Sequence, residues 1–202
     1  MKGYNGDYFS TIRNKVAEMF QIAVLHKHIP INKFATLFVN SPIAHAFETA
    51  DPIYALGKSA RELVEILIDE EDESFTIAES ASPEYWVGWV LASAQFMLNK
   101  SYKTLINAYP CDDVLDNYFP YHEMDINHIV DIYAEKIKEN NPLKMIREQR
   151  KLSQSELATI SNVPIRNIRA YEQGKLDIAK AQADTVLSLA RALNCSIEDL
   201  IY

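Results

Sequence analysis

Residues 152–174 read LSQSELATISNVPIRNIRAYEQG, and this stretch predicts two short helices joined by a tight turn. Ser153 and Glu156 have the spacing of a capping box, in which each side chain accepts a hydrogen bond from the other residue's backbone N–H. The first helix therefore begins here. Asn162 stands where a helix can end on a residue in the left-handed conformation, which asparagine tolerates. Pro164 has a backbone angle suited to opening the second helix.

The second helix is expected over residues 165–173, and Gly174 ends it. Ile168 and Tyr171 are three residues apart, so they share one face, and their apolar character predicts that this face is buried. The opposite face then carries Arg166, Asn167, Arg169 and Ala170.

Flanking segments supply the other helices of this region. We expect one at residues 143–150, one that contains residues 186–193, and a last short helix that Ser196 caps at residues 196–199. Apolar residues at helical spacing predict a shared core. Its expected members are Leu143, Ile146, Leu157, Ile160, Ile168, Tyr171, Val186, Leu189, Ala190, Leu193, Ile197, Leu200 and Ile201.

Residues 143–201 resemble the lambda-repressor-like, XRE-type helix-turn-helix family. The resemblance is carried by LSQSELA, by the V-x-x-x-x-I-x-x-Y-E-x-G run from Val163 to Gly174, and by LARALN followed by SIEDLI. It implies a five-helix domain that binds double-stranded DNA and places the second helix of the pair in the major groove.

The resemblance also implies roles for individual residues. Those implied to read bases are Ile165, Arg166, Arg169 and Ala170. Those implied to contact phosphate are Gln154, Asn167, Gln173, Lys175 and Lys180. Two residues depart from the family pattern: Pro164 replaces a serine or threonine that bonds phosphate, and Asn162 replaces glycine.

Arg147 and Glu172 occupy the two positions at which this family places a bonded pair. Glu172 follows the buried Tyr171, so its carboxylate is expected on the inner side of the second helix, where an unpaired charge is costly. Arg147 follows the inward Ile146 and can offer that carboxylate two N–H donors. We therefore predict a direct Arg147–Glu172 salt bridge.

The charge is distributed unevenly along the chain, which favours two domains, at residues 1–140 and 141–202. Residues 1–140 hold 11 Lys and Arg against 21 Asp and Glu, a net charge of −10, whereas residues 141–202 hold 9 against 7, a net charge of +2. An acidic body of this kind disfavours contact with a duplex, so DNA binding is assigned to residues 141–202.

Residues 1–140 show helical periodicity throughout, which predicts an all-α fold for the whole chain. Helices are expected at residues 8–26, 31–38, 42–48, 60–68, 83–99, 101–108, 112–119 and 127–139. The acidic run at residues 69–73 and the link to Ser82 are interpreted as a solvated loop. The helix at 83–99 carries Tyr85, Trp86, Trp89 and Phe96, which we expect in the core, with a ligand-binding or partner-facing role as the alternative.

Residues 38–48, 52–59 and 85–89 resemble, more loosely, an all-helical extension of antitoxin-like bacterial regulators. That resemblance suggests a toxin protein bound by the N-terminal domain. A homodimer is also expected, because one recognition helix makes few base contacts and two half-sites double them.

Several classes of function are not indicated. Cys111 and Cys195 form no C-x-x-C pair, and the histidines have no ligand spacing, so we expect neither a metal nor another cofactor. No catalytic motif is visible, so an enzyme is not expected. The chain has no apolar run long enough for a membrane span and no signal peptide, so a cytoplasmic location is expected.

The sequence therefore predicts a DNA-binding transcription regulator that represses from a palindromic operator and is the antitoxin of a toxin–antitoxin operon. The alternative is a protein-interaction module, toxin-neutralising or adaptor, that retains the fold without binding DNA.

Overall fold

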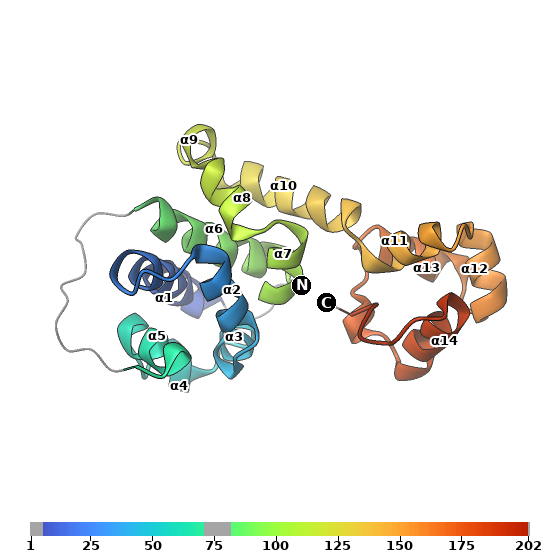
Figure 1. Ribbon diagram of the computed structural model, residues 1–202, viewed down its shortest axis with the longest axis horizontal. Coiled ribbons are helices and arrows are strands. Elements are labelled where there is room, and N and C mark those ends of the chain that lie inside the picture. Colours follow the sequence, from blue (N-terminus) through green and yellow to red (C-terminus); the bar gives the residue numbers. More distant parts are fainter. Residues whose placement is uncertain (1–5, 71–81, 202) are drawn as a thin grey trace. The chain divides into compact units, whose positions relative to one another are not determined.

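The computed structural model describes residues 6–70 and 82–201, and every regular element in these ranges is a helix (Figure 1). The all-α prediction is confirmed. Contacts divide the chain into two compact units, Met1–Tyr133 and Ala134–Tyr202, which we call the N-terminal unit and the C-terminal unit. The division falls inside one helix, α10 (Ile126–Glu139).

The N-terminal unit is built from short helices, several of which begin at a capping side chain. They are η1 (Gly6–Tyr8), α1 (Phe9–Gln21), the π-helical turn η2 (Ile22–His26), α2 (Ile31–Val39), α3 (Pro42–Glu48), α4 (Pro52–Ala55), α5 (Ala60–Ile68), α6 (Pro83–Leu98), α7 (Tyr102–Ala108), α8 (Cys111–Asp116), α9 (Tyr118–Tyr121) and the first part of α10. The side chains of Ser41, Asp51, Ser59, Ser82 and Ser101 each accept a hydrogen bond from a backbone N–H of the following helix. These caps satisfy donors that the first helical turn leaves unpaired.

The core of the N-terminal unit forms where α1 packs against α6 (Figure 1). Ile12, Val16 and Phe20 of α1 are fully buried. Gly88 of α6 makes the crossing close, because a Cβ atom there would lie 2.8 Å from Ala17 Cα and 2.8 Å from the Val16 carbonyl oxygen. The two helices therefore touch at a point with no room for a side chain on α6.

One helix expected in this unit is interrupted. Instead of a single helix over residues 112–119, the structure has α8 and α9 with a break at Asn117. The Asn117 side chain donates to the carbonyl of Asp113 over 2.7 Å, which competes with backbone bonding. Pro120 has no N–H to bond the carbonyl of Asp116, four residues earlier. Of the expected acidic loop, residues 71–81 lie outside the described part of the chain.

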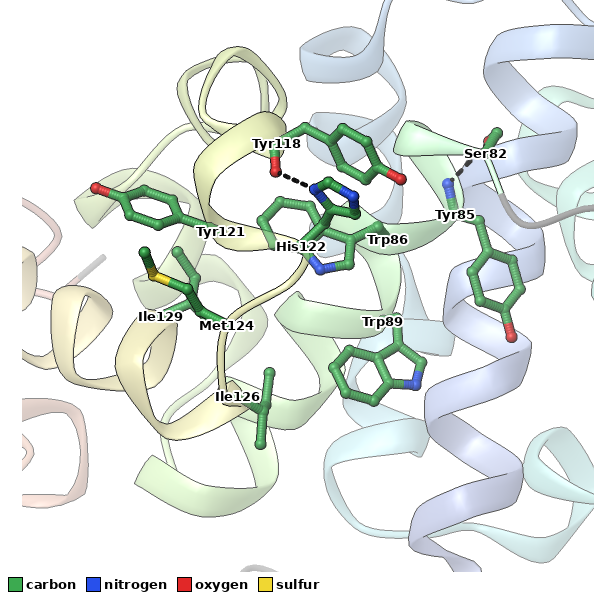
Figure 2. Close-up of a pocket in the computed structure, with 10 residues that line it drawn as sticks. All are labelled: Ser82, Tyr85, Trp86, Trp89, Tyr118, Tyr121, His122, Met124, Ile126 and Ile129. Carbon is green, nitrogen blue, oxygen red and sulfur yellow. Dashed lines mark hydrogen bonds between the residues drawn. The ribbon is translucent and has the colours of Figure 1, made fainter.

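The aromatic residues of α6 are not all in the core. Phe96 is buried, as expected, but Tyr85, Trp86 and Trp89 are only half-buried and line a pocket (Figure 2). They lie in the first two turns of α6, where the Tyr118 ring of the single-turn helix α9 packs edge-on against Trp86 and the Arg13 guanidinium of α1 lies over Trp89. The core prediction is wrong for these three residues, because the neighbouring segments leave each of them only partly covered.

The C-terminal unit contains the end of α10 and four further α-helices around one core. They are α11 (Pro142–Gln149), α12 (Gln154–Ser161), α13 (Ile165–Glu172) and α14 (Ala183–Leu193), with the 3-10 turn η3 (Ile178–Lys180) before α14. The buried members of the core are Leu143, Leu157, Val163, Ile168, Tyr171, Val186, Leu189, Ala190, Leu193 and Leu200, and Ile146, Ile197 and Ile201 pack partly against it.

Two expectations for this unit are wrong. Ile160 was expected in the core but is 59% exposed. Successive residues of a helix are rotated by about 100° around its axis. Leu157 and Ser161 are the buried residues of α12, and Ile160 lies about 60° from the first and about 100° from the second around this axis. The last short helix expected at residues 196–199 is a turn instead. The side chains of Ser196 and Asp199 each accept a hydrogen bond from the other residue's backbone N–H. One backbone hydrogen bond, from Leu200 N to the Ile197 carbonyl, closes the turn.

The two cysteines lie in different environments. Cys111 begins α8 and is fully buried, and this burial raises the pKa of its thiol to about 12. Cys195 follows α14 and is half-buried, and burial raises the pKa of its thiol as well. Both side chains act as small apolar groups in the packing of their units.

Candidate nucleic-acid interface

Helices α12 and α13 and the turn between them form a helix-turn-helix. The helix α12 begins at the capping box that the sequence predicted: Glu156 N donates to Ser153 Oγ over 3.1 Å, and Ser153 N donates to Glu156 Oε2 over 2.7 Å. These hydrogen bonds favour the ionised carboxylate and lower the pKa of Glu156. The start of α12 is therefore fixed by side chains on the first turn itself.

The turn between the two helices is closed by its own polar groups. Asn162 ends α12 in the left-handed conformation, with φ of 56°. The buried Ser161 hydroxyl donates to the Leu157 carbonyl over 2.6 Å and accepts from Val163 N over 3.3 Å. Because Ser161 bonds both the helix and the turn, it restricts the direction in which α13 leaves.

Helix α13 has one buried and one outward face. Ile168, Tyr171 and Glu172 are buried. The residues predicted to read bases lie on the rest of the surface: Arg166 and Arg169 are exposed, and Ile165 and Ala170 are half-buried. Within the part of the chain that the structure describes, neither arginine has a hydrogen bond or an ion pair. Their guanidinium groups are available to a ligand.

The Arg147–Glu172 ion pair is present in the structure, and it is buried. Arg147 Nε donates to Glu172 Oε1 over 2.6 Å, and Nη2 donates to Oε2 over 3.0 Å. The Arg147 and Glu172 side chains are 9% and 3% exposed. The Glu172 carboxylate raises the pKa of the Arg147 guanidinium. A two-pronged contact of this kind fixes the angle between α11 and α13.

The remaining donors of Arg147 are satisfied as well. Its Nη1 donates to the Leu152 carbonyl over 2.7 Å, in the loop between α11 and α12, and Nη2 also lies 3.3 Å from Glu148 Oε1. A buried charge is tolerated when its hydrogen-bonding capacity is met. This network therefore joins α11, the following loop and α13.

Gln154, predicted to contact phosphate, also joins this network. Its Nε2 donates to Glu172 Oε2 over 2.8 Å, so the first residue of α12 is tied to the last residue of α13. An amide nitrogen carries two N–H groups, and the second remains for a phosphate oxygen. The sequence did not predict the contact with Glu172.

Asn141 is another residue whose role the sequence did not reveal. It is 9% exposed, it caps α11 by accepting from Lys144 N over 3.1 Å, and its Nδ2 donates to the Tyr171 carbonyl over 2.9 Å. An asparagine directly before a proline was a signal for a cap at the start of α11. The contact with α13 depends on distant residues and had no local signal.

The other predicted phosphate contacts lie on the surface. Asn167 is half-buried, and Gln173, Lys175 and Lys180 are exposed. Lys180 Nζ lies 3.8 Å from Asp177 Oδ2, and the lysine side chain is 64% exposed, so a phosphate can replace this contact at little cost.

A hollow of about 420 Å³ lies between α12 and the start of α13. Its lining residues are Ser155, Ala158, Thr159, Asn162, Val163, Pro164 and Ile165. Ser155 and Thr159 present exposed hydroxyl groups beside the predicted base-reading residue Ile165. The i, i+4 spacing of the two hydroxyls was a visible signal for a polar surface of α12, and it was missed.

Among residues 6–70 and 82–201, no three His, Cys, Asp or Glu side chains come together in a way that could hold a metal ion. Over the same residues, none of the helices combines the length and the apolar character that a bilayer span requires.

Comparison with known families gives a match for the C-terminal part of the chain. Residues 143–200 match the family described as Helix-turn-helix. A comparison with curated proteins found no match, and a comparison with solved structures found none either. The family match confirms the resemblance of this segment to helix-turn-helix domains and supports a DNA-binding transcription regulator.

Proposed function

We propose that this chain binds a specific double-stranded DNA site and represses transcription from it, as a homodimer on a palindromic operator. The observation that carries the proposal is α13, whose outward face bears two arginines that have no partner among the described residues, inside a helix-turn-helix domain. Repression is steric in this proposal, because a protein that occupies an operator excludes other proteins from it.

Base readout is assigned to the outward face of α13. Arginine offers two parallel N–H groups that fit guanine O6 and N7, and Arg166 and Arg169 have no competing partner among the described residues. Ile165 and Ala170 supply apolar contacts for a thymine methyl. Four such residues discriminate few base pairs, which favours two copies of the domain on two half-sites.

Phosphate contacts are assigned to Gln154, Asn167, Gln173, Lys175 and Lys180. Contacts with the phosphate backbone position a protein on the duplex without reading its sequence. The hydroxyl group of Ser155 can add to this set, because Ser155 is exposed at the hollow between α12 and the start of α13, whereas the Thr159 hydroxyl already donates to the Ser155 carbonyl over 3.0 Å.

The test is a mobility shift of the full chain with fragments of its own promoter. Arg166→Ala and Arg169→Ala should each weaken operator binding by about 1–3 kcal/mol, with the loss concentrated at one base pair per half-site. Arg191→Ala is the matched control, because Arg191 is an exposed arginine on α14 outside the proposed interface. Equal losses on random DNA would show that the two arginines contact only the backbone.

Lys175 provides a separate test of positioning. Lys175→Ala should weaken binding to specific and random DNA alike and lower the slope of log K against log salt by about 1. An unchanged slope would remove Lys175 from the interface.

We further propose that the N-terminal unit binds a protein partner, a toxin that this chain neutralises. The net charge of −10 over residues 1–140 disfavours DNA as its ligand. Large apolar residues are exposed on α4, directly after it and on α5, where Ile53 is 64%, Leu56 57% and Ile66 53% exposed. Apolar residues that are exposed together as one patch are typical of protein contacts.

A second candidate function follows from the same surface: an interaction module whose helix-turn-helix no longer binds DNA. The two functions differ in a direct measurement. A promoter shift that Arg166→Ala abolishes supports the regulator. A chain that binds a partner but shifts none of its promoter fragments supports the interaction module.

A further inference from the structure

The N-terminal unit contains a pocket of about 300 Å³ that the proposed DNA binding does not use. Figure 2 shows Trp86 and Trp89 of α6 on one side of it, with Met124 and Ile126 among the residues on the other side. The second group comes from the turn after α9 and from the start of α10. Segments separated by about 35 residues thus supply its walls.

Part of the wall is an ordered row of rings (Figure 2). The Tyr118 ring packs edge-on against Trp86 at 5.4 Å and stacks on His122 at 4.3 Å. His122 Nδ1 lies 3.0 Å from the Tyr118 carbonyl oxygen, where a protonated Nδ1 donates to it. Because these rings hold one another in place, a ligand that packs against them loses little free energy in ordering the side chains.

The pocket carries no formal charge from acidic or strongly basic residues, because its lining includes no Lys, Arg, Asp or Glu. Glu123 Oε1, which lies 3.8 Å from Nε2 of the lining residue His122, and the net charge of −10 over residues 1–140 both disfavour an anion. A cation would meet a different obstacle. The guanidinium of Arg13 already lies over the Trp89 ring, 4.5 Å from its centroid. A second cation against this ring would be repelled by the first.

With anions and cations disfavoured, the ligand that fits this pocket is uncharged and flat. Aromatic faces and edges recognise other rings by offset stacking and edge contacts, which need no charge. An apolar cavity of about 150 Å³ is sufficient for one benzene molecule, so a pocket of about twice that volume has room for two fused rings.

We propose that the pocket lined by Trp86, Trp89, Tyr118 and Ile126 binds an uncharged, planar aromatic molecule of about two fused rings. The proposal does not rest on DNA binding or on a toxin partner. It assigns these half-buried aromatic side chains of α6 to a ligand rather than to the core.

The chain offers a direct readout of this pocket. It contains two tryptophans, Trp86 and Trp89, and both line the pocket, so all of its indole fluorescence originates there. The full chain is titrated with three bicyclic probes of similar size that differ in charge: coumarin, which is neutral, 2-naphthoate, which is anionic, and N-methylquinolinium, which is cationic. Spectra are corrected for absorption by the probe.

Coumarin should change the tryptophan emission saturably, and the two charged probes should bind about tenfold more weakly or worse. Tighter binding of N-methylquinolinium than of coumarin would overturn the proposal in favour of a cation cage. A response that stays linear for all three probes reflects collisional quenching and would also overturn it.

Ile126→Phe tests the location, because it narrows the pocket and leaves both tryptophans in place. It should weaken coumarin binding by about tenfold. Leu37→Phe is the matched control at an exposed apolar residue of α2 and should bind as the parent chain does. Met124→Phe is a second pocket variant at a residue that is 48% exposed, where a larger ring leaves the fold intact. Unchanged coumarin affinity in a folded Ile126→Phe or Met124→Phe chain would place the ligand elsewhere and refute the proposal.

Discussion

The two units hold their central helices together by different means. In the N-terminal unit, α1 and α6 meet at Gly88, where a Cβ atom would lie 2.8 Å from the Ala17 backbone. In the C-terminal unit, α11 and α13 meet through the buried Arg147–Glu172 ion pair. The close crossing of α1 and α6 requires only that the residue at Gly88 has no side chain. The ion pair requires an arginine and a carboxylate that face each other. The ion pair could be predicted, because the family resemblance named both partners, whereas the close crossing at Gly88 is visible only in three dimensions.

The largest expected effect comes from removing one member of the ion pair. Arg147→Ala leaves the Glu172 carboxylate buried without its main partner and should destabilise the C-terminal unit by about 3–5 kcal/mol. Urea denaturation of the full chain measures the loss. The exposed Arg191→Ala is the control and should change stability little.

The double variant Arg147→Met, Glu172→Leu sharpens the comparison further. It replaces the pair by apolar side chains, so no buried charge is left unpaired and most of the lost stability should return. If the double variant is as unstable as Arg147→Ala, the ion pair itself contributes the stability. The two units would then differ more in how their helices are held together than we expect.

Gly88→Ala should have the next largest effect. The added methyl group collides with backbone atoms of α1, which cannot turn aside as a side chain can, and overpacking of this kind costs about 1–3 kcal/mol. Gly6→Ala is the control, because a Cβ atom at Gly6 meets nothing within 4 Å. A Gly88→Ala chain as stable as its parent would contradict a steric crossing.

Gln154→Ala should have a smaller effect on stability. It removes one donor to Glu172 Oε2, which still accepts from Arg147 Nη2, so a loss of about 1 kcal/mol is expected. Gln149→Ala, at an exposed glutamine on α11, is the matched control. A loss as large as that of Arg147→Ala would show that Gln154 is an equal member of the network.

The smallest expected effect depends on pH. The capping hydrogen bonds lower the folded-state pKa of Glu156 below its ordinary value of 4.5, so the unfolded chain binds a proton more readily. The stabilisation from ionised Glu156 is therefore fully present above pH 4.5 and is lost as pH falls through the lowered pKa. Glu156→Gln should reduce stability at neutral pH, and its difference from the parent chain should shrink in acid. A constant difference over this range would contradict the assignment.

Much of the C-terminal unit could be predicted from the sequence, because its signals are local. The Ser153–Glu156 box, the left-handed Asn162 and the apolar spacing of α14 each involve neighbours within one or two helical turns. The buried ion pair joins residues farther apart, but the family resemblance named both of them, and a buried carboxylate needs a cation.

The wrong expectations concern side chains whose burial depends on segments that are distant in the sequence. Ile160 is exposed because Leu157 and Ser161 define the inward face of α12. Trp86 and Trp89 line a pocket because the residues around α9 cover the start of α6 incompletely. The spacing of apolar residues in α12 and α6 does not show which of these side chains the other segments cover. The contact of Gln154 with Glu172 likewise needed the angle between two helices, which residue spacing does not give.

The burial of Cys111 has a consequence for chemical labelling. The thiolate is the nucleophile that attacks thiol-directed reagents, and a buried thiol with a pKa of about 12 supplies almost no thiolate at neutral pH. The chain has two cysteines, so the half-buried Cys195 is the one that reagents reach in the folded protein. A maleimide dye should therefore attach slowly, at a single place after α14, in the wild-type sequence. Fast modification of Cys111 would then report that α8 has opened.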